Sequence, residues 1–261
     1  MTIKKLIVLD LFSGIGGFSL GLETTNRFRT VAFCENDKYC QYVLSQHWPN
    51  VPIFDDIKTL DLEQLNNLPS IDVLCGGFPC QPISTAGKQK GECDERWMWP
   101  EFYRIICLVK PTWVLVENVT GLLSIGQGKL FGGILSDLAN AGYNAEWKVL
   151  SGNMFGLPQI RKRVFLVAYS MQQRLSFNEI FNKIDNKIME KWTYETYFRY
   201  LEVVERSYPE IPKYLRVDNG LSRRLDKTEI DIRIKMLGNS IIPKCSEYIG
   251  KCIIDCIDGT K

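Results

Sequence analysis

Short apolar runs alternate with stretches of helical periodicity along the first 170 residues, and this alternation limits the possible folds more than any other feature. The first four runs end in or just before glycines and acidic residues, which is typical of buried strands. The runs occupy residues 6–10, 30–34, 71–74, 112–116, 147–150 and 164–168, and helical periodicity is found in 36–48, 97–109 and 129–141. Strands that alternate with helices usually pair in parallel, so the pattern predicts an α/β protein with a mostly parallel, doubly wound sheet.

Chemically active side chains follow four of these predicted strands. Asp10 and Glu35 close the first two, Cys80 lies in the loop after the third, and Glu117 follows the fourth. In such sheets ligands bind outside the carboxyl ends of the strands. The sequence therefore predicts one crevice where these four side chains meet.

A glycine-rich loop links the first strand to a helix. Gly14, Gly16 and Gly17 would let the backbone approach a ligand closely. The spacing differs from the nicotinamide fingerprint, because Ser19 stands where G-x-G-x-x-G has its third glycine. Glu35 lies about 20 residues further on, where nucleotide-binding folds place an acid on ribose hydroxyls. Together these features predict a nucleoside site.

Asp56 belongs to a third acidic turn, at residues 53–57. Its carboxylate could accept a hydrogen bond from an adenine amino group, or it could cap the turn. The sequence alone leaves both interpretations open.

Cys80 lies in a stiff loop at residues 75–84, which contains two glycines and two prolines. Pro79 and Pro82 fix their own φ angles and push the residues before them towards extended backbone, so the cysteine is held from both sides. Free cysteines are usually small core residues. A thiol held rigidly at a strand end is nevertheless a candidate nucleophile.

Composition argues against several classes of protein. The nine cysteines show no paired Cys-x-x-Cys spacing and His47 is the single histidine, which argues against zinc modules and a disulfide framework. No apolar run approaches the roughly 20 residues that span a bilayer, and the N-terminus lacks a signal-peptide pattern. We therefore expect an intracellular protein without a membrane partner.

The pattern changes after residue 170. Residues 171–214 combine apolar positions at helical spacing with a cluster of aromatic residues, which predicts a small helical lobe. The chain from residue 151 onwards carries more basic than acidic residues, and Arg223 and Arg224 could grip a nucleic-acid backbone. A final helix follows residue 241, and we interpret its cysteines as packing residues; they are Cys245, Cys252 and Cys256.

Taken in order, these motifs resemble those of the cytosine carbon-5 DNA methyltransferase family, of prokaryotic or phage type. The resemblance covers residues 5–170 and about 215–257. It rests on six stretches: the cofactor loop 10–17, the acids Glu35 and Asp56, the nucleophile motif 79–81, the acid motif 117–119, the paired-arginine motif 159–163 and the final motif 238–240. It implies a Rossmann-like S-adenosylmethionine-dependent methyltransferase fold with a small target-recognition lobe.

The resemblance also implies roles for individual residues. The implied catalytic residues are Cys80, Glu117, Arg161 and Arg163. The implied cofactor-binding residues are Asp10, Phe12, Gly14, Gly16, Gly17, Glu35, Asn36, Asp56, Ile57, Pro79, Asn239 and Ser240. The implied substrate-binding residues are Gln81, Ser84, Asn118, Arg223 and Arg224. No metal site is expected.

The implied chemistry explains these residue types. Cys80 would add as a thiolate to carbon 6 of a cytosine flipped out of duplex DNA, which makes carbon 5 nucleophilic enough to take a methyl group from S-adenosylmethionine. Arg161 and Arg163 would favour the thiolate. Glu117 would bind the ring nitrogen 3 edge, and Arg163 would hold the ring carbonyl oxygen.

We therefore expect three regions, a catalytic and cofactor-binding domain at 1–170, a target-recognition region at 171–214 and a return segment at 215–261. Asn36 stands where many relatives have a bulkier apolar group. We expect a monomer that methylates double-stranded DNA at a short sequence. It would lie in the cytoplasm, associated with the nucleoid, or in the host cytoplasm if a phage encodes it. A cognate restriction endonuclease is a candidate partner. A tRNA cytosine methyltransferase and a non-catalytic nucleic-acid-binding subunit remain alternatives.

Overall fold

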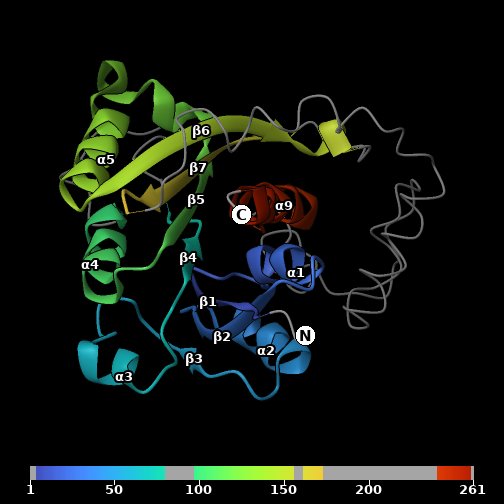
Figure 1. Cartoon of the computed structure of the whole chain (residues 1–261). Helices are drawn as coiled ribbons and strands as arrows, with labels where there is room; N and C mark the ends of the chain where they lie inside the picture. The colour runs from blue at the N-terminus through green and yellow to red at the C-terminus, as the bar shows by residue number, and fades with distance from the viewer. Residues whose placement is uncertain (1–3, 80–96, 156–160, 173–239, 260–261) are drawn as a thin grey trace, which may run out of the picture.

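A seven-stranded sheet with helices on both faces forms the described part of the chain (Figure 1). The computed structural model describes residues 4–79, 97–155, 161–172 and 240–259. The strand order is β3-β2-β1-β4-β5-β7-β6. The strands are β1 (Leu6–Leu11), β2 (Phe28–Cys34), β3 (Ile53–Phe54), β4 (Val73–Gly76), β5 (Trp113–Val119), β6 (Tyr143–Ser151) and β7 (Lys162–Ser170).

The helices fall into two layers. In Figure 1, α4 and α5 lie on one side of the sheet, and α1 and α9 lie on the other. The α-helices are α1 (Gly17–Glu23), α2 (Lys38–His47), α3 (Leu62–Asn66), α4 (Trp99–Val109), α5 (Lys129–Asn140) and α9 (Pro243–Gly259). Short 3-10 helices are η3 (Thr120–Leu123), η4 (Ile125–Gly128) and η5 (Gly152–Phe155). The doubly wound α/β fold predicted from the sequence is confirmed.

Five strands are parallel, and β7 runs against both of its neighbours. β1, β2, β3, β4 and β5 pair in parallel, whereas β7 pairs antiparallel with β5 and with β6. Parallel neighbours need a crossover connection of about a dozen residues or more. Only residues 152–161 lie between β6 and β7, so the last two strands pair antiparallel, as a hairpin at one edge of the sheet.

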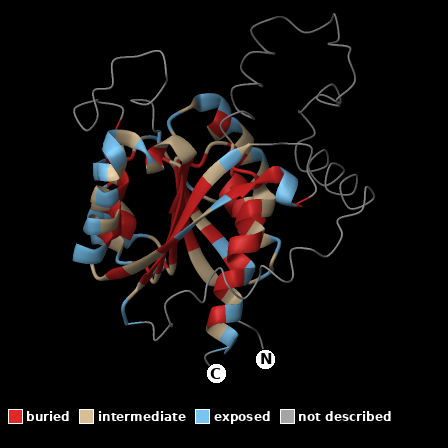
Figure 2. Cartoon of the chain, turned by 90° about the horizontal axis from the view of Figure 1, so that it is seen from above, coloured by how far each residue is buried: buried red, intermediate tan, exposed pale blue. Residues whose placement is uncertain are grey.

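Alternate residues of the central strands enter two separate cores. Val114, Val116 and Leu166 belong to the cluster that contains the apolar residues of α4 and α5. Trp113, Leu115 and Phe165 belong to the cluster with α1 and α9. Figure 2 shows the resulting layer of buried strand residues between the helices. Burial on both faces explains why the strands are continuous apolar runs.

Small residues bring α1 and α9 close together. A Cβ added at Gly17 would collide with the carbonyl of Ile241, and one at Gly21 would collide with Pro243 and Ser246. The Ser246 hydroxyl donates to the Gly17 carbonyl at 3.1 Å. The return segment is therefore anchored directly behind the glycine-rich loop.

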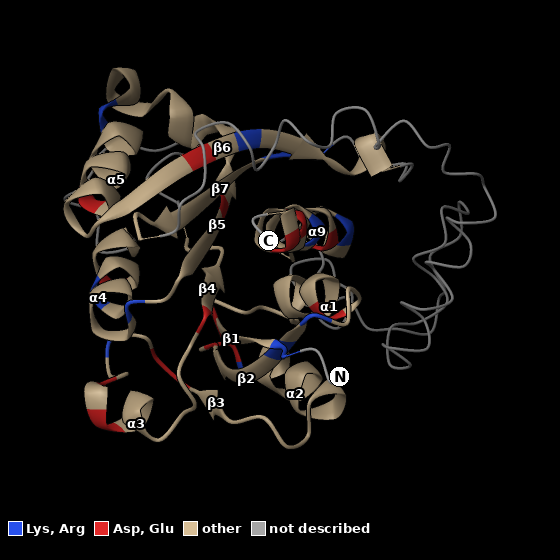
Figure 3. Cartoon of the chain, viewed as in Figure 1, with Lys and Arg blue, Asp and Glu red and all other residues tan. Residues whose placement is uncertain are grey.

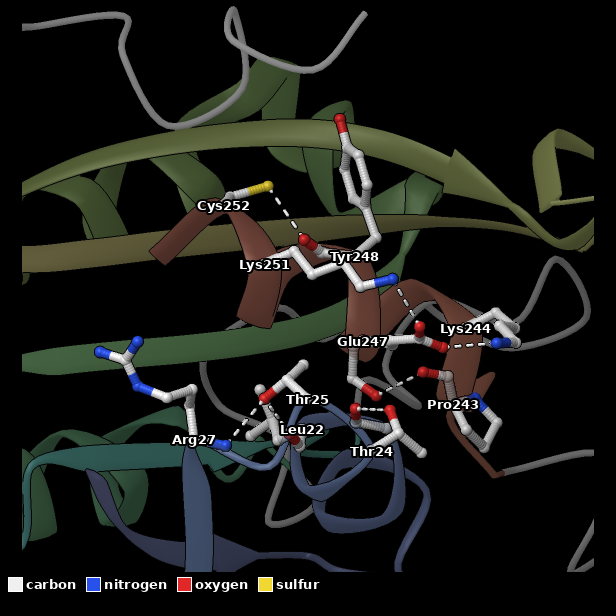
Figure 4. A network of polar contacts seen from close by, with 12 residues as sticks. Leu22, Thr24, Thr25, Arg27, Pro243, Lys244, Glu247, Tyr248, Lys251 and Cys252 are labelled. Carbon is white, nitrogen blue, oxygen red and sulfur yellow. Dashed lines mark hydrogen bonds and ion pairs between the residues drawn. The ribbon is translucent and has the colours of Figure 1, made fainter. Parts of the chain in front are cut away.

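Polar contacts lie near both ends of α9, and Figure 4 shows those near its start. The Glu247 carboxylate pairs with Lys244 and Lys251 at 2.5 and 2.7 Å. Near the other end of the helix, Arg27 pairs with Asp258 at 2.8 Å. Acidic and basic residues are thus mixed along this helix, as Figure 3 shows. Its three cysteines, Cys245, Cys252 and Cys256, are buried in the core cluster that α9 shares with α1, which confirms that they are packing residues.

Several predicted features lie outside the described residues. They include the recognition region beyond residue 172 and the residues Cys80, Gln81, Ser84, Arg223, Arg224 and Asn239. Among the helices that are described, none combines the length and apolar character needed to cross a membrane.

Candidate active site

The carboxyl ends of β1, β2, β4 and β5 meet at one edge of the sheet, as the sequence predicts. Asp10 on β1 lies beside Phe33 on β2 and beside Cys75 on β4. Gly76, the last residue of β4, pairs with Val116 of β5. The residues that follow these positions therefore surround a common edge.

The loop after β1 turns sharply at three residues with positive φ. They are Phe12 (50°), Gly14 (55°) and Gly16 (83°), which is the N-cap of α1. A Cβ at Gly14 would meet nothing within 4 Å, whereas one at Gly16 would strike the Trp48 ring. The loop is thus packed on one side and open at Gly14.

The Glu35 carboxylate fastens this loop to the end of β2. Its two oxygens accept from the backbone N–H groups of Gly14 at 2.7 Å and Asp37 at 2.8 Å. Burial raises the pKa of Glu35, and these hydrogen bonds act in the opposite direction. Each carboxylate oxygen has a further lone pair, so a ligand hydroxyl could still bind here.

Asp10 lies beneath the loop. Its side chain is 1% exposed and accepts from the Ser19 hydroxyl of α1 at 2.7 Å. Burial raises the pKa of Asp10 to about 7. Because the Asp10 side chain is so deeply buried, it can affect a ligand only indirectly, by fixing the loop above it. Ser19, at the position of the missing third glycine, thus ties α1 to β1.

The acidic turn after β3 combines a half-buried capping residue with buried apolar side chains. The Asp56 carboxylate accepts from the Lys58 N–H at 2.9 Å, so the turn-capping interpretation holds for one of its oxygens. The Ile57 side chain is buried in the core, which leaves only its backbone to face a ligand. Asn36 and Pro79, two other predicted cofactor residues, are exposed.

Glu117 is a buried acid between two arginines. It is 7% exposed, and one carboxylate oxygen lies 3.1 Å from Nε of Arg163 and 4.0 Å from Nη2 of Arg161. Burial raises the pKa of Glu117 to about 7, and the two guanidinium groups offset only part of this effect. Gly77 covers the other oxygen, because a Cβ there would lie 3.0 Å from it.

Arg161 also contacts the return segment. Its Nη1 donates to the carbonyl of Ser240 at 2.5 Å. Burial lowers the pKa of Arg161, and the neighbouring charge of Arg163 acts in the same direction. The arginine predicted to favour a thiolate therefore also joins Ser240 of the final motif to Glu117.

Asn118 holds the loop that leads to the predicted nucleophile. Its side chain is 3% exposed, and Nδ2 donates to the carbonyl of Phe78 at 3.1 Å. Its Oδ1 accepts from the Val119 N–H at 2.9 Å. Asn118 was predicted to bind substrate. In the structure its side chain binds the backbone of Phe78, two residues before Cys80.

An aromatic cluster around α4 packs against both the glycine-rich loop and the loop that leads to Cys80. Phe78 packs against Trp97, with ring centroids 5.4 Å apart, and against Phe102 at 6.1 Å. Phe12 stacks on the same Phe102 ring at 6.5 Å and an interplanar angle of 9°. Sequence analysis missed this link because core aromatics carry no motif, and it assigned no contact to Gly77 or to the Ser19 hydroxyl.

No group of three or more metal-ligating side chains occurs in the described ranges.

The family model of the C-5 cytosine-specific DNA methylases matches residues 6–218. The chain belongs to this family. The resemblance inferred from the motifs is therefore confirmed, and so is the methyltransferase fold.

Several Type II methyltransferases are similar to the chain. Type II methyltransferase M2.BsuMI of Bacillus subtilis is 38% identical over 166 residues, which cover 62% of this chain and 41% of the relative. Type II methyltransferase M.Bsp6I of Bacillus sp. is 36% identical over 177 residues, 66% of this chain and 55% of the relative. The chain spans about half the length of the curated relatives it matches.

Two solved structures resemble the fold. A protein described as a DNA modification methyltransferase encoded within an E. coli prophage superposes with a TM-score of 0.58 at 26% identity, over 67% of this chain and 49% of that one. The Dnmt2 methyltransferase of S. pombe gives 0.60 over 98% of this chain and 100% of that one at 17% identity, which supports the fold alone.

The residues present fit S-adenosylmethionine. The Glu35 carboxylate retains lone pairs for ribose hydroxyls, Phe12 offers a ring backed by Phe102, and the loop is open at Gly14. Carboxylate acceptors and an aromatic face are what a ribose and an adenine ring need. Asp56 stands at the same edge of the sheet, after β3.

Proposed function

We propose that the chain is a DNA cytosine-5 methyltransferase that uses S-adenosylmethionine and acts at a short sequence. The observation that carries the proposal is the position of Glu117. This buried acid lies between Arg163 and Gly77, and the neighbouring Asn118 is bonded to the loop that leads to Cys80. The acid Glu117, the cations Arg161 and Arg163, and a thiol motif that follows β4 are the groups needed for attack on a pyrimidine ring.

Cys80 would act as the nucleophile. Its thiolate would form a bond to carbon 6 of cytosine, the 5,6 electron pair would shift to the 4,5 position, and the 3,4 pair would move onto nitrogen 3, where a proton is taken up. After carbon 5 has been methylated, its proton would pass to a water molecule, and the released electron pair would re-form the 5,6 double bond as the carbon–sulfur bond breaks, which restores the Cys80 thiolate. Arg161 and Arg163 would supply the positive charge that stabilises this thiolate.

Glu117 would supply a proton at ring nitrogen 3 as the adduct forms. Its pKa of about 7 means that a large fraction of the carboxyl is protonated at neutral pH. A general acid works best when its pKa lies near the working pH. Arg163, 3.1 Å from Glu117, keeps the carboxyl in place and can also hold the ring carbonyl oxygen.

The cofactor residues have separable tasks. Glu35 would hold the ribose, Phe12 the adenine ring, and Asp56 the adenine amino group. Bound S-adenosylmethionine supplies an electrophilic methyl group. The remaining residues shape its pocket, with Asp10 and Ser19 fixing the loop from below.

The substrate proposal follows from the relatives. The two relatives described above carry the name Type II methyltransferase. A duplex base cannot reach a pocket at a strand edge, so the target cytosine would be flipped out, at a cost of a few kcal/mol. We propose that the chain acts as a monomer on cellular DNA in the cytoplasm, with a restriction endonuclease as candidate partner.

A labelling experiment tests this function. Purified protein is incubated with methyl-labelled S-adenosylmethionine and either duplex DNA or tRNA, beside a Cys80→Ser variant. The proposal predicts label in DNA carbon 5, none with the variant, and no reduction when unlabelled tRNA is added. Label in tRNA alone would replace the DNA substrate, and equal signals from both proteins would refute the catalytic role of Cys80.

A further inference from the structure

Arg104, in the middle of α4, makes three polar contacts that the catalytic proposal does not use. Its Nη1 donates to the carbonyl of Leu60 at 2.9 Å and its Nη2 donates to the carbonyl of Ile57 at 2.5 Å. Its Nε donates to the Glu101 carboxylate, one turn earlier on the helix, at 2.8 Å. The guanidinium thus reaches from α4 to the turn that follows β3.

This turn is a single helical turn that begins at Asp56. The N–H of Thr59 donates to the Asp56 carbonyl at 3.2 Å, and the N–H of Leu60 donates to the Ile57 carbonyl at 3.3 Å. The carbonyls at the end of such a turn need further donors. Arg104 supplies two of them, while Ile57 and Leu60 bury their side chains below the turn.

The two ends of the turn are held differently. Ile57 and Leu60 are held by packing and by Arg104. Asp56, one residue before Ile57, is half-buried and makes local hydrogen bonds: its carboxylate accepts from the Lys58 N–H and its carbonyl from Thr59. The position of this carboxylate depends on the backbone directly behind it. A change at Ile57 would therefore be transmitted to Asp56.

We propose that Arg104 is a positioning residue for nucleobase recognition, which holds Asp56 where it can accept from the adenine amino group. This inference rests on the proposed function, since it concerns the same cofactor pocket. Arg104 itself would not touch the ligand. It sets the geometry of the acceptor, and through that the selectivity for an amino group over an oxo group at carbon 6.

The contacts require an arginine. A planar guanidinium reaches two carbonyls and one carboxylate with separate N–H groups, whereas a lysine ammonium cannot match this fixed fork. The Glu101 carboxylate orients the guanidinium by accepting a hydrogen bond from its Nε. The neighbouring Phe102 backs Phe12, so one turn of α4 supports two predicted contacts to the nucleobase.

Calorimetric titration of the whole chain with S-adenosylhomocysteine and with S-inosylhomocysteine tests the inference. The second probe carries an oxo group in place of the amino group. Wild type and Arg104→Met are compared, with Arg104→Lys as the conservative variant. Arg27→Met is the matched control, because Arg27 also donates twice from its guanidinium, to Asp258, at a site remote from the turn.

The expected result is a loss of selectivity. Arg104→Met should weaken S-adenosylhomocysteine binding about tenfold, as expected for lost hydrogen bonds from a charged group. It should change S-inosylhomocysteine binding much less, so that the ratio of the two affinities falls. Arg104→Lys should lie nearer to Arg104→Met than to wild type, and Arg27→Met should keep the wild-type ratio.

The outcomes separate the two proposals. If wild type binds neither probe, the cofactor proposal fails and the inference falls with it. If wild type prefers the adenosyl probe and Arg104→Met shows the same ratio, only the inference on Arg104 is overturned. An equal loss for both probes in Arg104→Met would indicate general weakening of the fold and would also overturn it.

Discussion

Replacing Glu117 with glutamine should make the protein more stable at alkaline pH, although it should abolish methylation. Burial raises the pKa of Glu117 from 4.5 to about 7 in the folded chain. A carboxyl whose folded pKa is raised keeps its full stability at low pH and loses it as the pH rises through the folded pKa. Glutamine has a similar shape and no charge, so it avoids this loss.

The size of the effect follows from the pKa. A tenfold change in proton affinity is about 1.4 kcal/mol, so the rise from 4.5 to about 7 costs about 3 kcal/mol when Glu117 is fully ionised. About 2 kcal/mol of this should appear between about pH 5.5 and about pH 8.5, because the unfolded carboxyl is already mostly ionised at the lower value.

Urea unfolding of wild type and Glu117→Gln across this pH range measures the effect. The difference in unfolding free energy should change by about 2 kcal/mol in favour of the variant as the pH rises. Asp10 also has a raised pKa, but it is present in both proteins and cancels in the difference. A difference that does not vary with pH, or one that increasingly favours wild type, would refute the electrostatic reasoning.

Two further substitutions test how the site is packed. Gly77→Ala should slow methylation by about 100-fold with little loss of stability, because the new Cβ would lie 3.0 Å from the Glu117 carboxylate, and small displacements of catalytic groups have effects of this size. Gly132→Ala, whose Cβ meets nothing within 4 Å, is the control and should keep full activity in the same assay. Asn118→Ala should destabilise the fold by about 1–2 kcal/mol in urea, because it leaves the Phe78 carbonyl without this donor. It should also slow covalent trapping on DNA that contains 5-fluorocytosine; an unchanged trapping rate would contradict the role assigned to this contact.

The sheet could be predicted because its strands are buried on both faces. The runs at 30–34 and 112–116 contain little besides apolar residues, and both were predicted within three residues of the observed limits of β2 and β5. β6 was predicted at 147–150 but begins at Tyr143. Its first half was missed because Asn144 and Glu146 interrupt the apolar run, although Glu146 is buried.

The direction of β7 could not be predicted from its composition. Its apolar run is as continuous as that of a parallel strand, and direction depends on the connection rather than on the residues. The hairpin formed by β6 and β7 places Arg163 opposite Val119, at the end of β5. This pairing explains how an arginine from the start of a strand reaches the same edge as Glu117.

The positions of the site's side chains were easier to predict than their contacts and roles. Glu35, Glu117 and Arg163 lie at the same end of the sheet, as motif order and the predicted strand ends indicate, and the last two are in contact. The contacts of Asn118 and Arg104 depend on tertiary structure, since each side chain binds a backbone carbonyl at least 40 residues away. Carbonyl partners leave no trace in a sequence motif, so such roles require the structure.

Sequencing of methylated cytosines in DNA from cells that express this chain alone tests the central claim most directly. Cys80→Ala and Glu117→Gln are expressed beside it as controls. The account predicts carbon-5 methylation at one short sequence with the natural chain, and background levels with both variants. Methylation that persists in Cys80→Ala, or an unmethylated genome from cells that contain the folded natural chain, would contradict it.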